Sequence, residues 1–368
     1  MKILVVASLT PPATANYLIG ALRDAKHEVF VCSDVASPLA DQLVYGAVDV
    51  ARVCSRHDFT PELMLFIEGG TMRLFPTGLE RMSCLTAWYG IDTHMDYAKH
   101  LRIGRLFDIT FIAQKEFVEK LRSDGLQQVN WLPLGFAQEL MPSSMPTRTI
   151  DIAYVGSNNV AANPQRHLLL AALQREFPST RFGPATPQEM GDIYASARVV
   201  FNRSVNNDVN MRFFEAAGSG AVLVTDPVID NGIEALFEEG KHYVVYHDEA
   251  SLLKEVRDLL AAPARCATMG ESASRHVLEY HTYHHRAASL LKAVEQFTKL
   301  PTPHQEDYFA ACLSLNLLSG ALRAAGRAMV FSSGGAYRKV MGGSAALMLY
   351  SLASVLGMIE WARARLLD

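Results

Sequence analysis

The stretch RVVFNRSVNNDVNMRFFEAAGSGAVLVTD, residues 198–226, carries the pattern that decides the fold. Its apolar run at 199–201 predicts a buried strand that ends at Asn202. After a polar loop, apolar residues recur at the spacing of a short helix, and two glycines, Gly218 and Gly220, end that helix before a second buried strand. We therefore expect the loop and the helix start to lie at the carboxyl edge of a sheet, where α/β proteins bind ligands.

Two charged residues of this helix, Arg212 and Glu215, are three positions apart and share one face. The pair permits two interpretations. It is a surface ion pair, or it is a ligand site in which the cation and the helix start hold a diphosphate while the carboxylate holds a ribose diol.

Apolar strands and helical segments alternate along most of the chain, which predicts parallel, doubly wound sheets. A length of 368 residues exceeds one ordinary domain. We predict an α/β fold with two Rossmann-like domains, at residues 1–140 and 150–298, and a helical extension at residues 301–368.

Composition excludes several classes of protein. The formal net charge of −4 gives no general attraction to nucleic acid. The five cysteines are widely spaced and form no paired motif, so we expect reduced thiols and a cytoplasmic protein. The loop after the first predicted strand lacks the G-x-G-x-x-G pattern, which argues against an NAD or FAD enzyme.

Two further polar clusters follow apolar strands. The first is Glu68 with two glycines, which is either a ligand crevice or a tight turn with a solvated carboxylate. The second contains Asp92 and His94, which suit acid–base chemistry or hydroxyl binding, while Asp92 or Thr93 also suits the N-cap of the helix that follows. Polar residues at 92, 94 and 96 could also bind a metal, but no further ligand set accompanies them, so we predict no metal site.

These motifs together resemble those of the CgeB-like, spore-maturation-type glycosyltransferases of the GT-B superfamily. The resemblance covers about residues 60 to 290. It rests on several segments in the correct order: Glu68 to Gly70, Phe75-Pro76, Trp88, Asp92 to Tyr97, Phe107-Asp108, Ala113 to Lys115, Trp131 to Leu134, Gly156, Asn202, and Asn210-x-Arg212-x-Phe214-Glu215-Ala216.

The resemblance implies a GT-B fold whose two domains face a cleft, with the nucleotide on the C-terminal domain and the acceptor mostly on the N-terminal one. The residues that it assigns to donor binding are Asn202, Asn210, Arg212, Glu215 and Gly156, and the catalytic candidates are Asp92, His94 and Glu68. Many retaining GT-B enzymes carry a second Glu eight residues before the ribose-binding one. This chain has Asn207 there, with Asp208 beside it, so retention and inversion both stay open.

The predicted function is transfer of a sugar from a nucleotide-diphosphate sugar to an acceptor that the sequence does not identify: a protein, a glycan or a small molecule. The resemblance implies no metal and no cofactor beyond the donor substrate. A nucleotide-sugar 2-epimerase of the same architecture and a non-catalytic interaction protein are the alternatives.

Residues 301–368 match no motif, and their periodicity predicts two long helices, at 308–330 and 345–367. The uncharged segment 341–359 is long enough for a membrane span, but glycines and serines dilute its apolarity. We therefore expect these helices to dock on a partner or on a second copy of the chain, with membrane association as the alternative.

Overall fold

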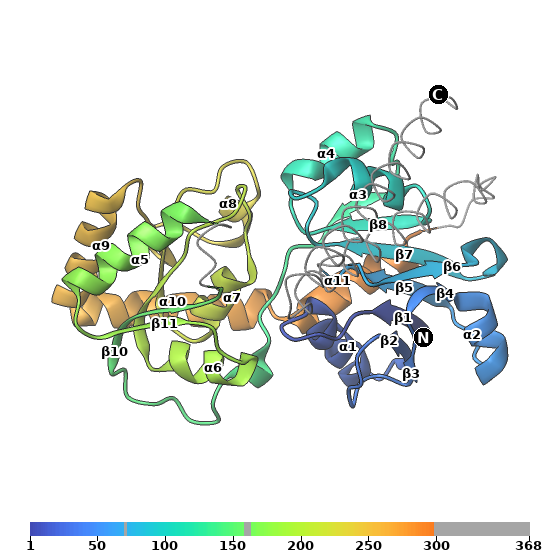
Figure 1. Ribbon diagram of the computed structural model, residues 1–368, viewed down its shortest axis with the longest axis horizontal. Coiled ribbons are helices and arrows are strands. Elements are labelled where there is room, and N and C mark those ends of the chain that lie inside the picture. Colours follow the sequence, from blue (N-terminus) through green and yellow to red (C-terminus); the bar gives the residue numbers. More distant parts are fainter. Residues whose placement is uncertain (70–71, 158–162, 298–368) are drawn as a thin grey trace, which may run out of the picture.

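The structure is a computed structural model that describes residues 1–69, 72–157 and 163–297 (Figure 1). The helical extension predicted at 301–368, with its uncharged segment, lies outside the described residues. Within the described ranges, no helix combines the length and the apolarity that crossing a lipid bilayer requires.

The N-terminal half is built on a seven-stranded sheet of order β3-β2-β1-β5-β7-β8-β9, in which all neighbours are parallel. Its strands are β1 (Lys2–Ala7), β2 (Glu28–Ser33), β3 (Gln42–Leu43), β5 (Leu63–Ile67), β7 (Leu85–Gly90), β8 (Ile109–Ile112) and β9 (Val129–Trp131). The helices of this half are α1 (Thr14–Asp24), α2 (Val50–His57), α3 (Tyr97–Gly104) and α4 (Glu116–Ser123), with short η1 (Leu79–Arg81). A separate parallel pair joins β4 (Gly46–Asp49) to β6 (Leu74–Thr77).

A second parallel sheet, of order β11-β10-β12-β13-β14, forms the centre of the C-terminal half. Its strands are β10 (Ile150–Val155), β11 (Thr180–Gly183), β12 (Ala197–Phe201), β13 (Val222–Thr225) and β14 (Tyr243–Val245). The remaining helices are η2 (Gln138–Leu140), α5 (Pro164–Glu176), α6 (Pro187–Ala195), α7 (Met211–Gly218), α8 (Ile233–Leu236), α9 (Glu249–Ala261), α10 (Pro263–Tyr280) and α11 (Tyr283–Glu295). The predicted fold class of two doubly wound parallel sheets is confirmed.

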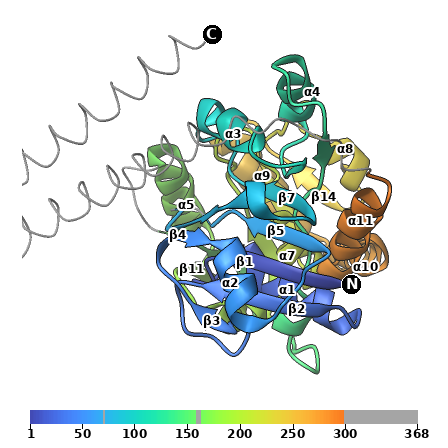
Figure 2. The same ribbon diagram turned by 90° about the vertical axis from the view of Figure 1, so that its right-hand side faces the viewer.

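Each large sheet has one switch point, where consecutive crossovers leave in opposite directions. In the first sheet it lies between β1 and β5, and in the second between β10 and β12. Loops that follow strands on either side of such a point splay apart and leave a crevice at the carboxyl edge. Viewed along the long axis, the first sheet lies in front of the second half (Figure 2).

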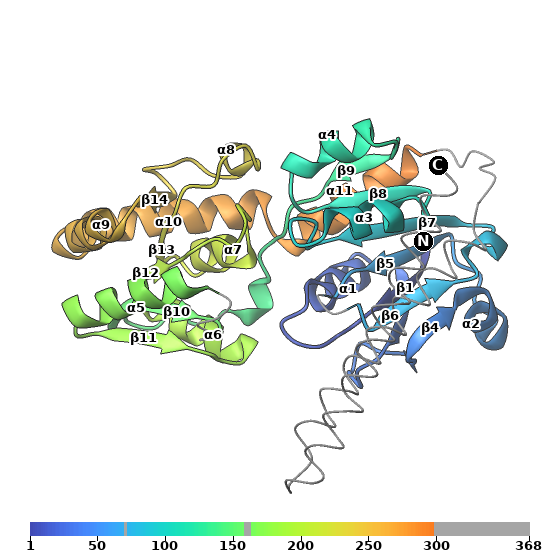
Figure 3. The ribbon, with the colours of Figure 1, turned by 45° about the horizontal axis from the view of Figure 1, so that its top comes forward.

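Within the described residues, the chain crosses between the two halves twice. The first crossing runs from Leu134 into residues 135–149, and the second is the junction between α10 and α11. Helix α10 lies with the second sheet, whereas α11 packs against α1 of the first half, where the rings of Tyr17 and Tyr283 have centroids 5.3 Å apart (Figure 3).

The two crossings lie side by side. The backbone N–H of Phe136 donates to the His281 carbonyl at 2.8 Å, and the N–H of Tyr283 donates to the Phe136 carbonyl at 3.0 Å. One cluster of buried apolar side chains continues from the first half through this region into the second, and it includes Leu134, Phe136 and Phe213. The orientation of the two halves is therefore fixed by packing as well as by chain connection.

Candidate active site

A cleft of about 970 Å³ opens between the carboxyl edges of the two sheets. From the first half, the loops after β1, β5 and β7 contribute to its lining, and from the second half the loops after β10, β11 and β12 together with α7. Six of the eight predicted site residues line it: Glu68, Asp92, Gly156, Asn210, Arg212 and Glu215. Both switch points therefore open into one cavity.

Helix α7 begins at the cleft with a side-chain cap. The Oδ1 atom of Asn210, the N-cap residue, accepts a hydrogen bond from the backbone N–H of Arg212 at 3.1 Å, and its Nδ2 donates to Oδ1 of Asn202 at 3.2 Å. A cap of this kind satisfies one of the free N–H groups and leaves others available for an anion. The start of α7 is thus a suitable site for a phosphate group.

The Arg212 guanidinium is held by three hydrogen bonds. Its Nε donates to the Tyr194 hydroxyl at 3.2 Å, one Nη to Asn202 Oδ1 at 2.6 Å and the other to the Val155 carbonyl at 2.9 Å. It also lies 4.6 Å from the centre of the Tyr154 ring. A guanidinium carries five N–H donors, so two remain for a ligand after these contacts.

Two predicted donor-site residues, Asn202 and Gly156, affect the site through their contacts with Arg212. Asn202 is fully buried at the end of β12, outside the cleft lining, and anchors both Arg212 and the α7 cap. Gly156 lines the cleft, and a Cβ added there would lie 3.0 Å from an Arg212 Nη atom and 2.6 Å from the Tyr154 hydroxyl. A side chain at this position would therefore displace the end of the Tyr154 or the Arg212 side chain.

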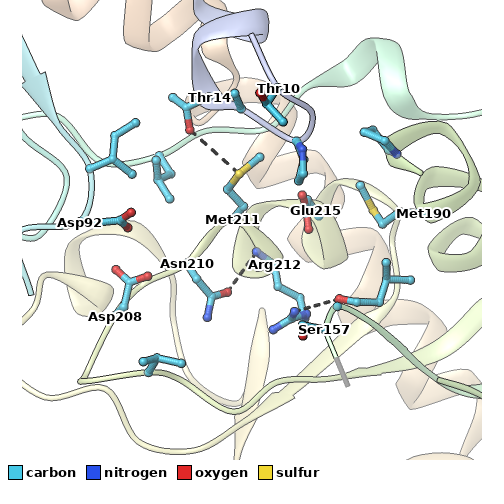
Figure 4. Close-up of a pocket in the computed structure, with 18 of the residues that line it drawn as sticks. Thr10, Thr14, Asp92, Ser157, Met190, Asp208, Asn210, Met211, Arg212 and Glu215 are labelled. Atoms are coloured by element: carbon cyan, nitrogen blue, oxygen red, sulfur yellow. Dashed lines mark hydrogen bonds between the residues drawn. The ribbon is translucent and has the colours of Figure 1, made fainter. Parts of the chain in front are cut away.

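Glu215 lies one turn after Arg212 and faces the cleft (Figure 4). Within the described ranges, no ion pair joins it to Arg212, so the simple ion-pair interpretation does not describe this helix face. Burial raises the pKa of Glu215 to about 7, although the positive charge of Arg212 opposes the rise. A carboxylate kept in the cleft without a cation on it is free to accept hydrogen bonds from hydroxyls.

On the opposite wall, Asp92 follows β7, and its carboxylate points into the cleft (Figure 4). The helix α3 is capped by Asp96 instead, whose side chain accepts from the Lys99 N–H at 3.1 Å. The N-cap interpretation of Asp92 is therefore wrong. Burial, and next the negative charge of Glu68, raise the pKa of Asp92, while His94, His100 and Lys99 act in the other direction.

The surroundings of Glu68 and His94 are not those expected of a base that contacts the substrate. Both oxygens of Glu68 are occupied, one by His100 and one by backbone N–H groups, although the residue borders the cleft. His94 does not belong to the cleft lining, and its Nδ1 is buried without a hydrogen-bond partner among the described residues. The structure therefore brings Asp92 to the cleft and leaves His94 beside it.

Three residues that were not among the predicted site residues contribute to the site. Asp208 is buried, lines the cleft opposite Asp92, and accepts a hydrogen bond from Gln114 Nε2 at 3.0 Å (Figure 4). Gln114 comes from the first half, so this bond joins the two walls. His100, in α3, pairs with Glu68. The only sequence signal for Asp208 was its position beside Asn207.

Asn207 itself faces away from the cleft. Its Nδ2 donates to Glu116 at 3.1 Å and to the Ile229 carbonyl at 2.7 Å. Asn206 and Asn207 both adopt left-handed backbone conformations, with φ of 49° and 65°. After this turn Asp208, one position later, lines the cleft.

The described residues contain no cluster of three or more His, Cys, Asp or Glu side chains placed to hold a metal ion. The charged groups that border the cleft are carboxylates and arginines. Besides Arg212 they include Arg166, which donates to the Ser157 carbonyl at 3.0 Å, and Arg203, which pairs with Asp226 at 2.8 Å.

Comparison with known proteins assigns the C-terminal half to a class. Residues 146–292 match the family described as Glycosyl transferase-like, and this match includes β10 to α10 and every donor-side residue named above. This segment is similar to a glycosyltransferase domain. No curated protein matches the chain.

Solved structures resemble this chain over both halves. They include HepE of Anabaena in complex with UDP and glucose (13% identity, 81% of this chain, 100% of that chain, TM-score 0.62). Sucrose-phosphate synthase of Thermosynechococcus elongatus has 14% identity over 80% and 99% of the two chains, with a TM-score of 0.58. An alpha-glucosyltransferase in complex with UDP and DNA has 9% identity over 80% and 100%, with a TM-score of 0.57. These likenesses show the fold alone, and the predicted GT-B architecture is confirmed. The predicted glycosyltransferase class agrees with the family match over residues 146–292.

Proposed function

We propose that the protein transfers a sugar from a nucleotide-diphosphate sugar to an acceptor hydroxyl. The observation that carries this proposal is the division of one cleft into two chemically different walls. The C-terminal wall offers the α7 start, Arg212 and the free Glu215 carboxylate, and the N-terminal wall offers Asp92 without a hydrogen-bond partner among the described residues. The motifs that extend over residues 60 to 290 also favour a CgeB-like enzyme within the class.

In this proposal the diphosphate lies against the α7 start and Arg212, and the ribose diol donates to Glu215. The anomeric carbon forms a bond to the acceptor oxygen while its bond to the diphosphate oxygen breaks, and the diphosphate leaves with the electron pair. Arg212 supplies positive charge where negative charge accumulates. The acceptor proton passes to Asp92, a step for which a positioned base typically contributes about 10² to 10⁴ in rate.

Metal independence is part of the proposal. A guanidinium with two unused donors and a helix start neutralise a diphosphate without a divalent cation. Turnover should therefore persist in EDTA, and a loss that Mg²⁺ or Mn²⁺ restores would refute this part. We infer a reducing, cytoplasmic compartment from the wide spacing of the five cysteines and from the absence of a paired motif in the sequence.

The donor test begins with UDP and UDP-sugars, because HepE and the alpha-glucosyltransferase were solved with UDP. A ligand that binds only the native state raises the melting temperature, so a thermal-shift screen that also includes GDP and dTDP identifies the base. Release of the nucleotide diphosphate from its sugar is then followed by 31P NMR, with and without candidate acceptors. Interconversion of donors without acceptor would indicate an epimerase, and binding without turnover a non-catalytic protein.

Two variants separate the walls. Glu215→Ala should weaken nucleotide affinity by roughly 1.5 to 3 kcal/mol, since it removes hydrogen bonds to a charged acceptor. Asp92→Asn should lower turnover by about 10² or more and leave nucleotide affinity within a factor of about two. Calorimetry and initial rates measure both effects. Normal nucleotide affinity in Glu215→Ala, or normal turnover in Asp92→Asn, would overturn the assignment of that wall.

A further inference from the structure

A buried pair of titratable side chains lies behind the loop that carries Asp92. Glu68 follows β5, His100 lies in α3, and the His100 Nε2 atom is 3.0 Å from Glu68 Oε1. Each side chain is only 2% exposed. The Trp88 ring packs edge-on against His100, with centroids 5.1 Å apart, which shields this side of the pair from water.

The pair binds three successive residues of the loop. The second oxygen of Glu68 accepts the backbone N–H of Ile91 at 2.7 Å and that of Asp92 at 3.1 Å. On the far side of the imidazole, His100 Nδ1 is 3.0 Å from the hydroxyl of Thr93, which is fully buried. Residues 91, 92 and 93 therefore all form hydrogen bonds with this one pair.

Gln114, which follows β8, also holds this loop. Its Nε2 donates to the Ile91 carbonyl and its Oε1 accepts the Thr93 N–H at 3.3 Å. The backbone on both sides of Asp92 is thus fixed, while the Asp92 carboxylate has no hydrogen bond to any described residue. The polar groups of the loop backbone are thus used to fix the loop itself, and the Asp92 carboxylate is left to contact a ligand.

We propose that Glu68 and His100 are positioning residues, which hold Asp92 at the acceptor wall and, through the negative charge of Glu68, make it a stronger proton acceptor. This inference rests on the proposed function, in which Asp92 takes the acceptor proton. Glu68 is not itself the base, because both of its oxygens are occupied.

The charges around Asp92 agree with this role. Burial is the largest cause of its raised pKa, and Glu68 is the next, because two neighbouring carboxylates resist ionising together. Lys99 and His100 face it from α3, and His94 from its own loop, and these three favour the ionised form. Across the cleft, Asp208 is a further like charge.

Glu68→Gln is the decisive variant, because the amide keeps an oxygen for the loop N–H groups and removes the charge. The pKa of Asp92 should fall, because the negative charge of Glu68 is one of the causes that raise it. Activity that needs ionised Asp92 then persists to lower pH, so the acidic limb of kcat/KM should move down by the same amount. A role limited to structure would lower kcat/KM equally at every pH and leave the limb in place, which would overturn the proposal.

The same shift can be measured without turnover. Carboxyl 13C resonances of aspartate-labelled protein titrate with pH, and the Asp92→Asn spectrum identifies the Asp92 signal. If the parent protein transfers no sugar, the proposed function fails, yet this titration still tests the effect of Glu68. An unchanged Asp92 titration in Glu68→Gln overturns the inference while leaving the transfer reaction intact.

His100→Gln provides a second test if Glu68→Gln does not fold. The shorter amide can reach Glu68 or Thr93 but not both, so Asp92 should be displaced and kcat should fall at least about tenfold with unchanged UDP affinity. Glu62→Gln is the matched control: this exposed carboxylate accepts the Lys2 N–H outside the cleft, and its pH profile should equal that of the parent. A normal kcat in His100→Gln would overturn the proposal.

Discussion

At the scale of single residues, Glu215 shows a conflict between stability and ligand binding. Its carboxyl group is buried without an ion pair in the described part of the chain, and its pKa rises to about 7. Folding therefore favours the protonated form, and the contribution of this group to stability is lost as pH rises from its unfolded pKa, near 4.3, through about 7. A ribose diol requires the opposite, an ionised acceptor at neutral pH.

Glu215→Gln should remove this conflict. Because the amide cannot ionise, the variant should be more stable than the parent at pH 8, on the order of 1 to 2 kcal/mol, and the difference should vanish near pH 4.5. Urea unfolding at both pH values measures it. Glu249→Gln, an exposed carboxylate on α9, is the control and should show no such trend. Equal stability of the Glu215 variant and the parent at pH 8 would contradict the expected burial cost.

From the sequence, the residues of the site were easier to predict than the directions in which their side chains point. The motifs place Asp92 after one strand and place Arg212 and Glu215 on the helix that follows another strand. These residues were therefore predictable, and all three line the cleft. The choice between Asn207 and Asp208 was not predictable, since it depends on two successive left-handed residues. His100 was likewise missed, because a buried partner for Glu68 appears only when β5 and α3 meet.

At the scale of elements, the cleft depends on how closely α7 approaches β10. Arg212 reaches the Val155 carbonyl and passes over the Tyr154 ring, which is possible only because residue 156 has no side chain. At its other end α7 packs on the first crossing, where a Cβ on Gly218 would come within 2.2 Å of the Phe136 ring. Two glycines therefore set the position of the donor wall.

Gly156→Ala should displace the guanidinium and lower UDP affinity about tenfold, equivalent to 1.4 kcal/mol. Its backbone lies outside the left-handed region, so the added methyl group, rather than strain in φ, is the cause. Titration calorimetry provides the affinity. Gly20→Ala in α1 has open space around the added methyl and serves as the control, with parental affinity. If Gly156→Ala bound UDP like the parent, Arg212 would not contact the diphosphate.

Element types were predictable where apolar periodicity is strong. The strand Leu63–Ile67 is a continuous apolar run that is buried at every position, which is typical of a strand covered on both faces. The short β3, β4 and β6 were not predicted, because two to four residues give too little periodicity to separate a strand from a loop.

At the scale of the whole molecule, Arg286 connects the two crossings. Its Nε donates to the Leu134 carbonyl at 2.8 Å, and one Nη donates to His281 Nδ1 at 3.1 Å. Burial lowers the pKa of Arg286 to about 10, so it stays charged at neutral pH. The sequence could not show that α11 would leave the second half to pack on α1, because that contact joins segments far apart in the chain.

Arg286→Ala should destabilise the protein by about 2 to 4 kcal/mol, because it leaves the Leu134 carbonyl and the His281 imidazole buried without their donor. Urea unfolding measures the loss. Arg257→Ala is the control, since Arg257 forms an exposed ion pair with Glu176 that is expected to contribute less than about 1 kcal/mol. Similar stability of the two variants would show that the crossings are held by apolar packing alone.

The paired crossings at Phe136 and Tyr283 also limit how the two halves can move. Because the two connections are adjacent, rotation of one half about the line that joins them preserves the Phe136–His281 and Tyr283–Phe136 hydrogen bonds. Sliding or twisting of one half against the other would break these bonds. A change in cleft width is then a rotation about this line, in which Asp92 and Glu215 approach each other or separate. One pair of spectroscopic labels, one on each half, would be sufficient to follow that motion.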